Sequence, residues 1–158
     1  MSAEIQSTIT ANELATLLIP MSGEQLVLPN VTVAEIIPYI EPQADNDKPD
    51  WYLGVFNWRN IDVPLVSFET INGESADNSQ GKDRRIAVLN GLVDSQRLPF
   101  CGIVTRGVPR LMRIMPDEVS VDEGATTGLS ELLRVLVSGE KAVIPNVDFI
   151  QQEVLSLL

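Results

Sequence analysis

The segment that decides the fold runs from residue 53 to residue 66 and reads Leu53-Gly54-Val55-Phe56-Asn57-Trp58-Arg59-Asn60-Ile61-Asp62-Val63-Pro64-Leu65-Val66. Two apolar runs of strand length, residues 51–56 and 61–66, lie on either side of a short polar turn. Asn57 and Asn60 suit this turn because asparagine tolerates backbone conformations that most residues avoid. The pattern predicts a β-hairpin with Arg59 at its tip.

The same alternation of apolar runs and turns extends along the chain. The other runs of strand length lie at residues 15–21, 25–28, 85–89, 98–105, 108–115 and 142–144. The turn Ser22-Gly23-Glu24 joins the first two into another predicted hairpin. A polar loop at residues 72–82 is the main internal break before a second β region.

Helical spacing occurs in three places. Apolar residues within 31–37 predict one or two helical turns that end before a proline. Leucines three and four residues apart predict a helix over residues 128–137. A C-terminal helix is expected from about Phe149, with Asp148 and Gln151 as its capping pair.

Two ten-residue segments resemble each other. Residues 22–31 and 138–147 share seven of ten amino acids. Both are interpreted as a glycine turn that leads into a strand ended by Pro-Asn, in preference to a duplication, because solenoid repeats need three or more units. Residues 1–12 are polar and predict a flexible tail, so one domain is expected over residues 13–156.

Composition excludes several classes of function. The chain has 158 residues, enough for one compact domain or two very small subdomains, and 44% of them are hydrophobic. Its net charge of −11 disfavours nucleic acids and anionic membrane surfaces. The chain has no histidine, the commonest general base and metal ligand.

Cysteine usage and the apolar pattern indicate a compartment. The single cysteine, Cys101, lies in an apolar run and is predicted to be a buried structural thiol. No signal-peptide pattern and no apolar run of about 18 residues is present in the sequence. A cytoplasmic location is expected.

Catalytic motifs are not supported by the spacing of the polar residues. The acidic loop that begins at Asp45 has Asp50 where a calcium loop needs glycine, and Phe56 where it needs glutamate. The glycines do not have nucleotide-binding spacings, and no serine has a histidine partner. No cofactor and no metal is predicted, and a carboxylate or metal-dependent hydrolase remains the weaker enzyme alternative.

Binding residues are the remaining candidates. Arg59, next to Trp58 on a β-turn, has the composition of an interface anchor, but also that of a neutral surface cation. Those two interpretations are close to even. Val33 and Glu35 also have two interpretations. They are a core valine and a solvated acid, or they belong to a binding surface.

Three segments resemble the CheW-like domain family. Leu28-Pro29-Asn30-Val31 through Val33-Ala34-Glu35-Ile36-Ile37 resembles the family's turn after a strand, and residues 53–66 resemble its hairpin signature. Gly102-Ile103-Val104-Thr105-Arg106-Gly107-Val108 resembles a stretch of the family's second barrel. The resemblance covers roughly residues 14–156, and the chain looks closest to the ChpC branch.

The resemblance implies a mainly β fold of two small, SH3-like, five-stranded β-barrels over a shared core, with short helices and a C-terminal helix. The implied function is a non-enzymatic adaptor that couples the cytoplasmic tips of chemoreceptors to a CheA-type histidine kinase, in chemotaxis or type IV pilus (twitching) signalling. It would work without membrane insertion, although receptor arrays would keep it close to the membrane. An SH3-like interaction module in another signalling or assembly complex is the alternative.

The resemblance also assigns partner-binding positions, which are Val33, Glu35, Arg59, Gly102 and Val108. Four residues depart from the family pattern. Asn60 replaces a glycine, Ser67 and Glu69 replace an aspartate and an arginine, and Arg106 replaces an aspartate. The charge reversal at Glu69 is expected to alter the standard partner surface.

Overall fold

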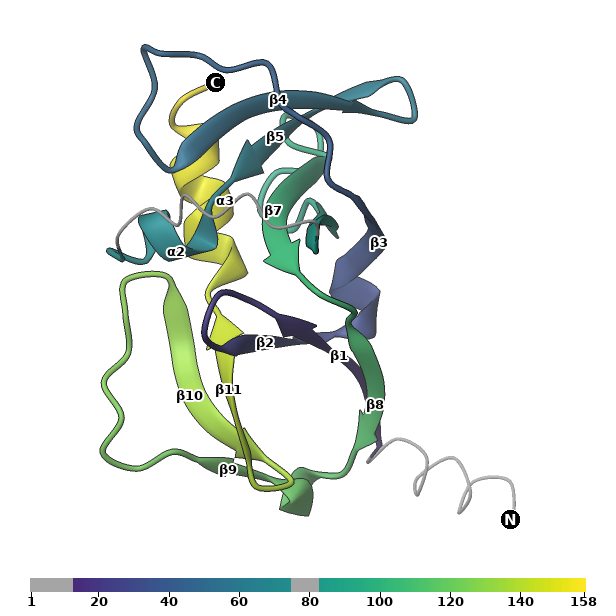
Figure 1. The fold of residues 1–158 in the computed structure, drawn as a ribbon, viewed down its shortest axis with the longest axis vertical. Coiled ribbons are helices and arrows are strands. Elements are labelled where there is room, and N and C mark those ends of the chain that lie inside the picture. The colour runs from purple at the N-terminus through teal and green to yellow at the C-terminus, as the bar shows by residue number, and fades with distance from the viewer. Residues whose placement is uncertain (1–12, 75–82) are drawn as a thin grey trace.

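The computed structural model describes residues 13–74 and 83–158 and arranges their strands in two sheets (Figure 1). The strands are β1 (Leu14–Pro20), β2 (Gln25–Pro29), β3 (Val33–Pro38), β4 (Tyr52–Trp58), β5 (Ile61–Val66), β6 (Arg84–Asn90), β7 (Phe100–Arg106), β8 (Arg110–Ile114), β9 (Val119–Val121), β10 (Glu131–Val137) and β11 (Glu140–Pro145). The helices are α2 (Phe68–Ile71) and α3 (Val147–Leu155), with 3-10 turns η1 (Asn30–Thr32) and η2 (Pro116–Glu118). The expected tail at residues 1–12, and residues 75–82 of the expected loop, lie outside the described residues.

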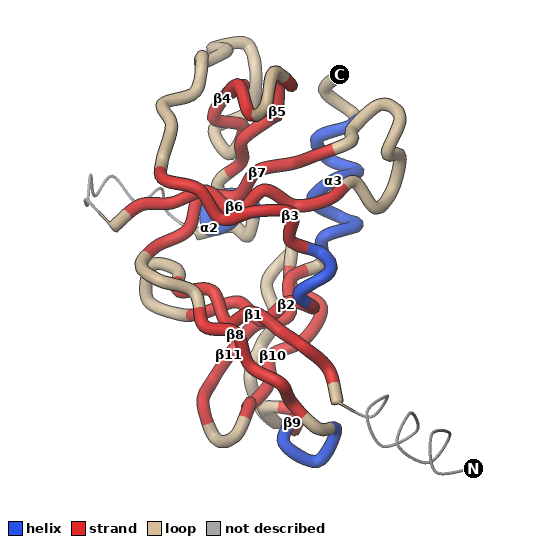
Figure 2. Tube along the Cα trace, turned by 90° about the vertical axis from the view of Figure 1, so that its right-hand side faces the viewer, coloured by secondary structure: helices blue, strands red, loops and turns tan. Residues whose placement is uncertain are grey.

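The two sheets contain different numbers of strands. One sheet has the order β3-β6-β7-β5-β4, and the other has the order β8-β1-β2-β11-β10-β9. Figures 1 and 2 place the sheets at opposite ends of the molecule, with α3 running from one towards the other. The mainly β class with a C-terminal helix is therefore confirmed. The second sheet has six strands rather than five because the three-residue strand β9 adds to β10.

The hairpin predicted around Arg59 is present. β4 and β5 pair antiparallel, and Trp58 faces Ile61 as the last pair before the tip. Arg59 and Asn60 form the two-residue turn, with φ angles of 50° and 64°. Positive φ at both positions is typical of the type I′ turn, whose twist matches that of the strands it joins.

A shared hydrophobic core lies between the two sheets and α3. Its buried members come from both sheets and both α-helices, among them Ile19, Leu26, Phe68, Ile103 and Val154. Cys101 belongs to this core, and burial raises the pKa of its thiol to about 12. The predicted role of Cys101 as a buried structural thiol is confirmed. No helix among the described residues is long and apolar enough to cross a membrane.

The helix predicted at residues 31–37 is wrong beyond its first turn. Only residues 30–32 are helical, and Val33 and Glu35 lie on β3, which pairs with β6. The pairing register shifts between these two residues. Such a bulge inserts one extra residue into a strand, so the apolar side chains acquire a spacing that resembles a helix.

The helix predicted at residues 128–137 is wrong for the same reason. Residues 131–137 form β10, and its register shifts between Glu131 and Leu133. The leucines at the start of this stretch are exposed, whereas Glu131 is buried. A bulge has therefore placed an acid inside and leucines outside, the reverse of what an amphipathic helix would do.

The C-terminal helix is present, but its predicted cap is wrong. Asn146, not Asp148, is the N-cap, and its Oδ1 accepts a hydrogen bond from the backbone N–H of Phe149 at 3.0 Å. Gln151 is wholly buried. Its amide donates to the carbonyl oxygen of Asn90 at 2.9 Å and accepts from the N–H of Leu92 at 2.8 Å, which ties α3 to the loop after β6.

The two similar ten-residue segments lie side by side. β2 and β11 form a parallel pair in which Val143 faces Leu26. Gly23 and Gly139 both turn the chain with positive φ, and both strands end at a proline. An asparagine follows each proline: Asn30 is the first residue of η1, and Asn146 is the N-cap of α3. The predicted common device of glycine turn, strand and Pro-Asn ending is confirmed.

Candidate interaction surface

Two of the predicted site residues are in direct contact. Nη2 of Arg59 donates to Oε2 of Glu35 at 3.1 Å and to Oε1 at 3.3 Å. Glu35 lies on β3 and Arg59 follows β4, and these two strands are the opposite edges of the five-stranded sheet. The ion pair therefore joins the two edges and helps to close the sheet on itself.

The exposure of this pair limits what it can contribute to stability. The side chains of Arg59 and Glu35 are 68% and 31% exposed, and exposed ion pairs contribute about 0–1 kcal/mol. Arg59 also has a left-handed backbone conformation, which costs an L-residue other than glycine roughly 1–2 kcal/mol. The geometry thus presents a fixed, accessible guanidinium with little gain in stability, as an interface anchor requires.

The other predicted site residues have different surroundings. Val33 is partly buried and packs against the shared core. Val108 is 69% exposed, in the connection between β7 and β8 where the chain passes from one sheet to the other. Gly102 is buried in β7, and a Cβ built on it would lie 2.8 Å from the ring of Phe56. Gly102 can therefore influence a binding surface only through packing.

Replacement of Gly102 tests this packing role. Gly102→Val should lower the free energy of unfolding by about 1–3 kcal/mol because the added side chain overlaps the Phe56 ring in a packed core. Urea unfolding measures this effect, and Val108→Ala should change it by less than about 0.5 kcal/mol because Val108 is exposed. A Gly102→Val protein of normal stability that had lost partner binding would instead indicate direct contact.

The departures from the family pattern have local explanations. Asn60 tolerates the φ of 64° that a glycine would otherwise adopt. Ser67 is the N-cap of α2, and its hydroxyl oxygen accepts a hydrogen bond from the N–H of Thr70 at 3.3 Å. Glu69 lies in the first turn of α2, where it accepts from the N–H of Ser22 at 3.4 Å. Nη1 of Arg106 lies 3.6 Å from Oδ1 of Asp83, so these two side chains form an ion pair.

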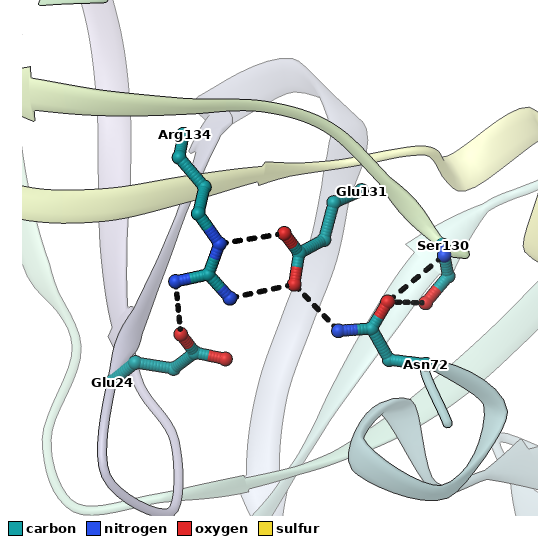
Figure 3. Close-up of polar contacts among 5 residues, drawn as sticks. All are labelled: Glu24, Asn72, Ser130, Glu131 and Arg134. Atoms are coloured by element: carbon teal, nitrogen blue, oxygen red, sulfur yellow. Dashed lines mark hydrogen bonds and ion pairs between the residues drawn. The ribbon is translucent and has the colours of Figure 1, made fainter. Parts of the chain in front are cut away.

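A buried polar network joins the C-terminal end of α2 to the six-stranded sheet and was not predicted from the sequence (Figure 3). Asn72, directly after α2, donates to Oε2 of Glu131 at 2.5 Å and accepts from the N–H and hydroxyl of Ser130. Arg134 forms two 2.8 Å hydrogen bonds with Glu131. Its remaining amino group lies 3.1 Å from Glu24, beside the β1–β2 turn. The side chain of Glu131 is fully buried.

The network holds Glu131 in its ionised form. Burial alone would raise the pKa of this carboxyl, but hydrogen bonds from Arg134, the backbone at Gly128 and Asn72, together with the charge of Arg134, lower it below 4.5. A cleft of about 580 Å³ lies alongside and is lined in part by Glu24, Arg134 and Lys141. Glu131 is ion-paired with Arg134 and its pKa is lowered, which does not favour the hydrolase alternative, because a general acid needs a raised pKa.

Comparison with known proteins shows that most of the chain matches one protein family. Residues 15–153 match the family described as the CheW-like domain. The fold is similar to that in the crystal structure of the scaffolding protein TtCheW from Thermoanaerobacter tengcongensis, with a TM-score of 0.69 and 16% sequence identity. That similarity covers 84% of this chain and 88% of the other. Comparison with curated proteins gives no match.

Proposed function

This chain belongs to the CheW-like domain family, and from that premise we propose that it is a non-enzymatic scaffold that couples the cytoplasmic tips of chemoreceptors to a CheA-type histidine kinase. Type IV pilus (twitching) control is the branch of signalling that we propose for it. Such a role requires a cytoplasmic location close to the receptor arrays. The fold similarity to a protein described as a scaffolding protein supports the proposed role as a scaffold.

The observation that carries the proposal is the hairpin tip. Arg59 and Glu35, which resemble family positions on the partner surface, form an ion pair that fixes an exposed guanidinium at the edge of the five-stranded sheet. A charged group that is held in place and remains accessible provides partner choice more than stability. The proposed binding positions are Val33, Glu35, Arg59 and Val108, and the fifth predicted residue, Gly102, is proposed to act on that surface through packing.

Reconstitution tests the proposed function. Receptor cytoplasmic fragments assembled on vesicles should pellet this chain, and the amount of CheA-type kinase in the pellet should rise when the chain is present. The matched controls are vesicles without receptor fragments and assemblies without the chain. If an affinity pull-down from the native cell recovered neither a receptor nor a histidine kinase, the alternative of an SH3-like module in another complex would replace this proposal.

A further inference from the structure

Trp58 occupies a site that apolar packing alone does not explain. It is the last residue of β4, it is 8% exposed, and its ring meets that of Phe100 edge to face at 4.7 Å between centroids. Within the described part of the chain, its buried Nε1 has no hydrogen-bond partner. A leucine or phenylalanine would fill an apolar site without leaving a buried N–H group unpaired, which is unfavourable.

The property that tryptophan adds is the electron-rich face of its indole. The guanidinium carbon of Arg59 lies over this ring, 4.8 Å from the centroid. Tryptophan is the aromatic residue that attracts a cation most strongly in this geometry. The indole and the carboxylate of Glu35 are therefore two independent contacts that hold the same guanidinium.

The rest of the Arg59 side chain is available to a partner. Glu35 bonds only Nη2 of Arg59, so Nε and Nη1 have no acceptor among the described residues. A free arginine side chain loses much rotamer freedom when it is ordered at an interface, and prior ordering improves affinity by reducing that cost. Arg59 is already ordered at a strained position of the turn, with a φ of 50°.

We propose that Trp58 is a positioning residue for partner binding: its indole holds Arg59 so that the free edge of the guanidinium meets a carboxylate or carbonyl acceptor of the partner. This inference rests on the proposed coupling function, and it goes further by assigning a role to a residue that does not itself need to touch the partner. Trp58 acts through Arg59, so its effect on binding requires Arg59 to be present.

Binding measurements on Trp58 variants test the inference. Trp58→Leu should weaken binding to receptor–kinase assemblies about tenfold, because it removes the ring face and leaves Arg59 to be ordered on binding. Trp58→Phe keeps a ring face and should recover most of this loss. Trp51→Leu is the matched control, because it also removes a tryptophan whose ring meets another aromatic ring edge to face, with 6.2 Å between the centroids of Trp51 and Tyr52. This variant should bind normally.

A double-mutant cycle separates positioning from a structural role. In an Arg59→Gln background, Trp58→Leu should produce no further loss of binding, because the group that it positions is gone. The same tenfold loss in both backgrounds would overturn the inference and indicate that Trp58 only supports the fold. Normal binding by Trp58→Leu with Arg59 present would overturn it too.

A measurement without any partner keeps this inference separate from the proposed function. By NMR, the side-chain Nε–H of Arg59 should show a ring-current shift that is retained in Trp58→Phe and lost in Trp58→Leu. An unchanged resonance in Trp58→Leu would overturn the inference. If the unmodified chain bound neither receptor nor kinase, the proposed function would fail, while the resonance would still decide whether Trp58 holds Arg59.

Discussion

Arg59→Glu is expected to weaken binding of the chain to receptor–kinase assemblies by about 30-fold or more, the loss of a hot-spot residue worth at least about 2 kcal/mol. The substitution replaces an exposed, fixed guanidinium with a carboxylate that faces Glu35 and the acceptor of the partner. The free energy of unfolding should change by no more than about 1 kcal/mol, because the lost ion pair is exposed. Co-sedimentation measures the first quantity and urea unfolding the second.

The chain contains a matched control for this variant. Arg110, on β8 of the other sheet, forms a 2.8 Å ion pair with Glu140, and both side chains are about half exposed. Arg110→Glu makes the same change in net charge and breaks the same kind of pair, but it should leave co-sedimentation unchanged. Equal losses in both variants would attribute the effect to net charge, and normal binding by a folded Arg59→Glu protein would remove Arg59 from the surface.

A second variant separates the internal pair from the contact with the partner. Exchanging the two residues, Glu35→Arg with Arg59→Glu, restores attraction between the edges of the sheet but reverses the charge at the hairpin tip. If Arg59 acts mainly on the partner, this double variant should remain as defective as Arg59→Glu. Recovery of binding would indicate that closing the sheet is the main role of the pair.

The hairpins could be predicted because their signals are local. Glycine and asparagine at positive φ mark the turns at Gly23 and Arg59-Asn60, and predicted apolar runs of strand length flank both turns. The glycine turn at Gly139 was also expected, but the strand before it, β10, was predicted as a helix. Both wrong helices occur at register shifts in strands, where one extra residue changes the spacing of apolar side chains. A bulge depends on the neighbouring strand, so the spacing within one segment cannot reveal it.

The candidate site could be predicted only as separate residues. The resemblance to the family indicated Glu35 and Arg59, but their contact joins positions 24 residues apart on opposite edges of a sheet. The buried network is even less local, because Asn72 and Glu131 are 59 residues apart. Glu131 and Arg134 fitted the polar face of the expected helix equally well. The burial of Glu131 follows from the way the end of α2 meets β10, which only the assembled fold shows.

Arg134→Met is expected to lower the free energy of unfolding at neutral pH by about 2–4 kcal/mol, because it leaves the buried carboxylate of Glu131 without its counter-charge. For a chain of this size, such a loss corresponds to a melting temperature lower by about 10 °C. The effect should remain below the upper end of the usual range, because Arg134 is partly exposed and Asn72 still donates to Glu131. Urea unfolding and thermal melting at neutral pH measure it.

The pH dependence of this loss identifies Glu131 as its origin. In the unmodified chain the pKa of Glu131 is lowered, so its contribution to stability is present above about pH 4.5 and is lost as the pH falls through the lower folded pKa. Without Arg134, burial dominates and the pKa of Glu131 rises. Acidification then protonates Glu131 in the variant and removes the cost of its unpaired buried charge. The difference in stability between the two proteins should therefore shrink as the pH falls from about 7 towards 5.

Glu131→Gln in the Arg134→Met background supplies the decisive comparison. The amide keeps an acceptor for Asn72 but carries no charge, so this double variant should recover much of the lost stability and lose its extra pH dependence. Glu74 lies in the same electrostatic environment, where burial and the charges of Glu24, Glu69 and Glu131 raise its pKa. Persistence of the pH dependence in the double variant would assign the effect to Glu74. No recovery at all would mean that Arg134 stabilises the fold by packing between β10 and the β1–β2 turn, not by neutralising Glu131.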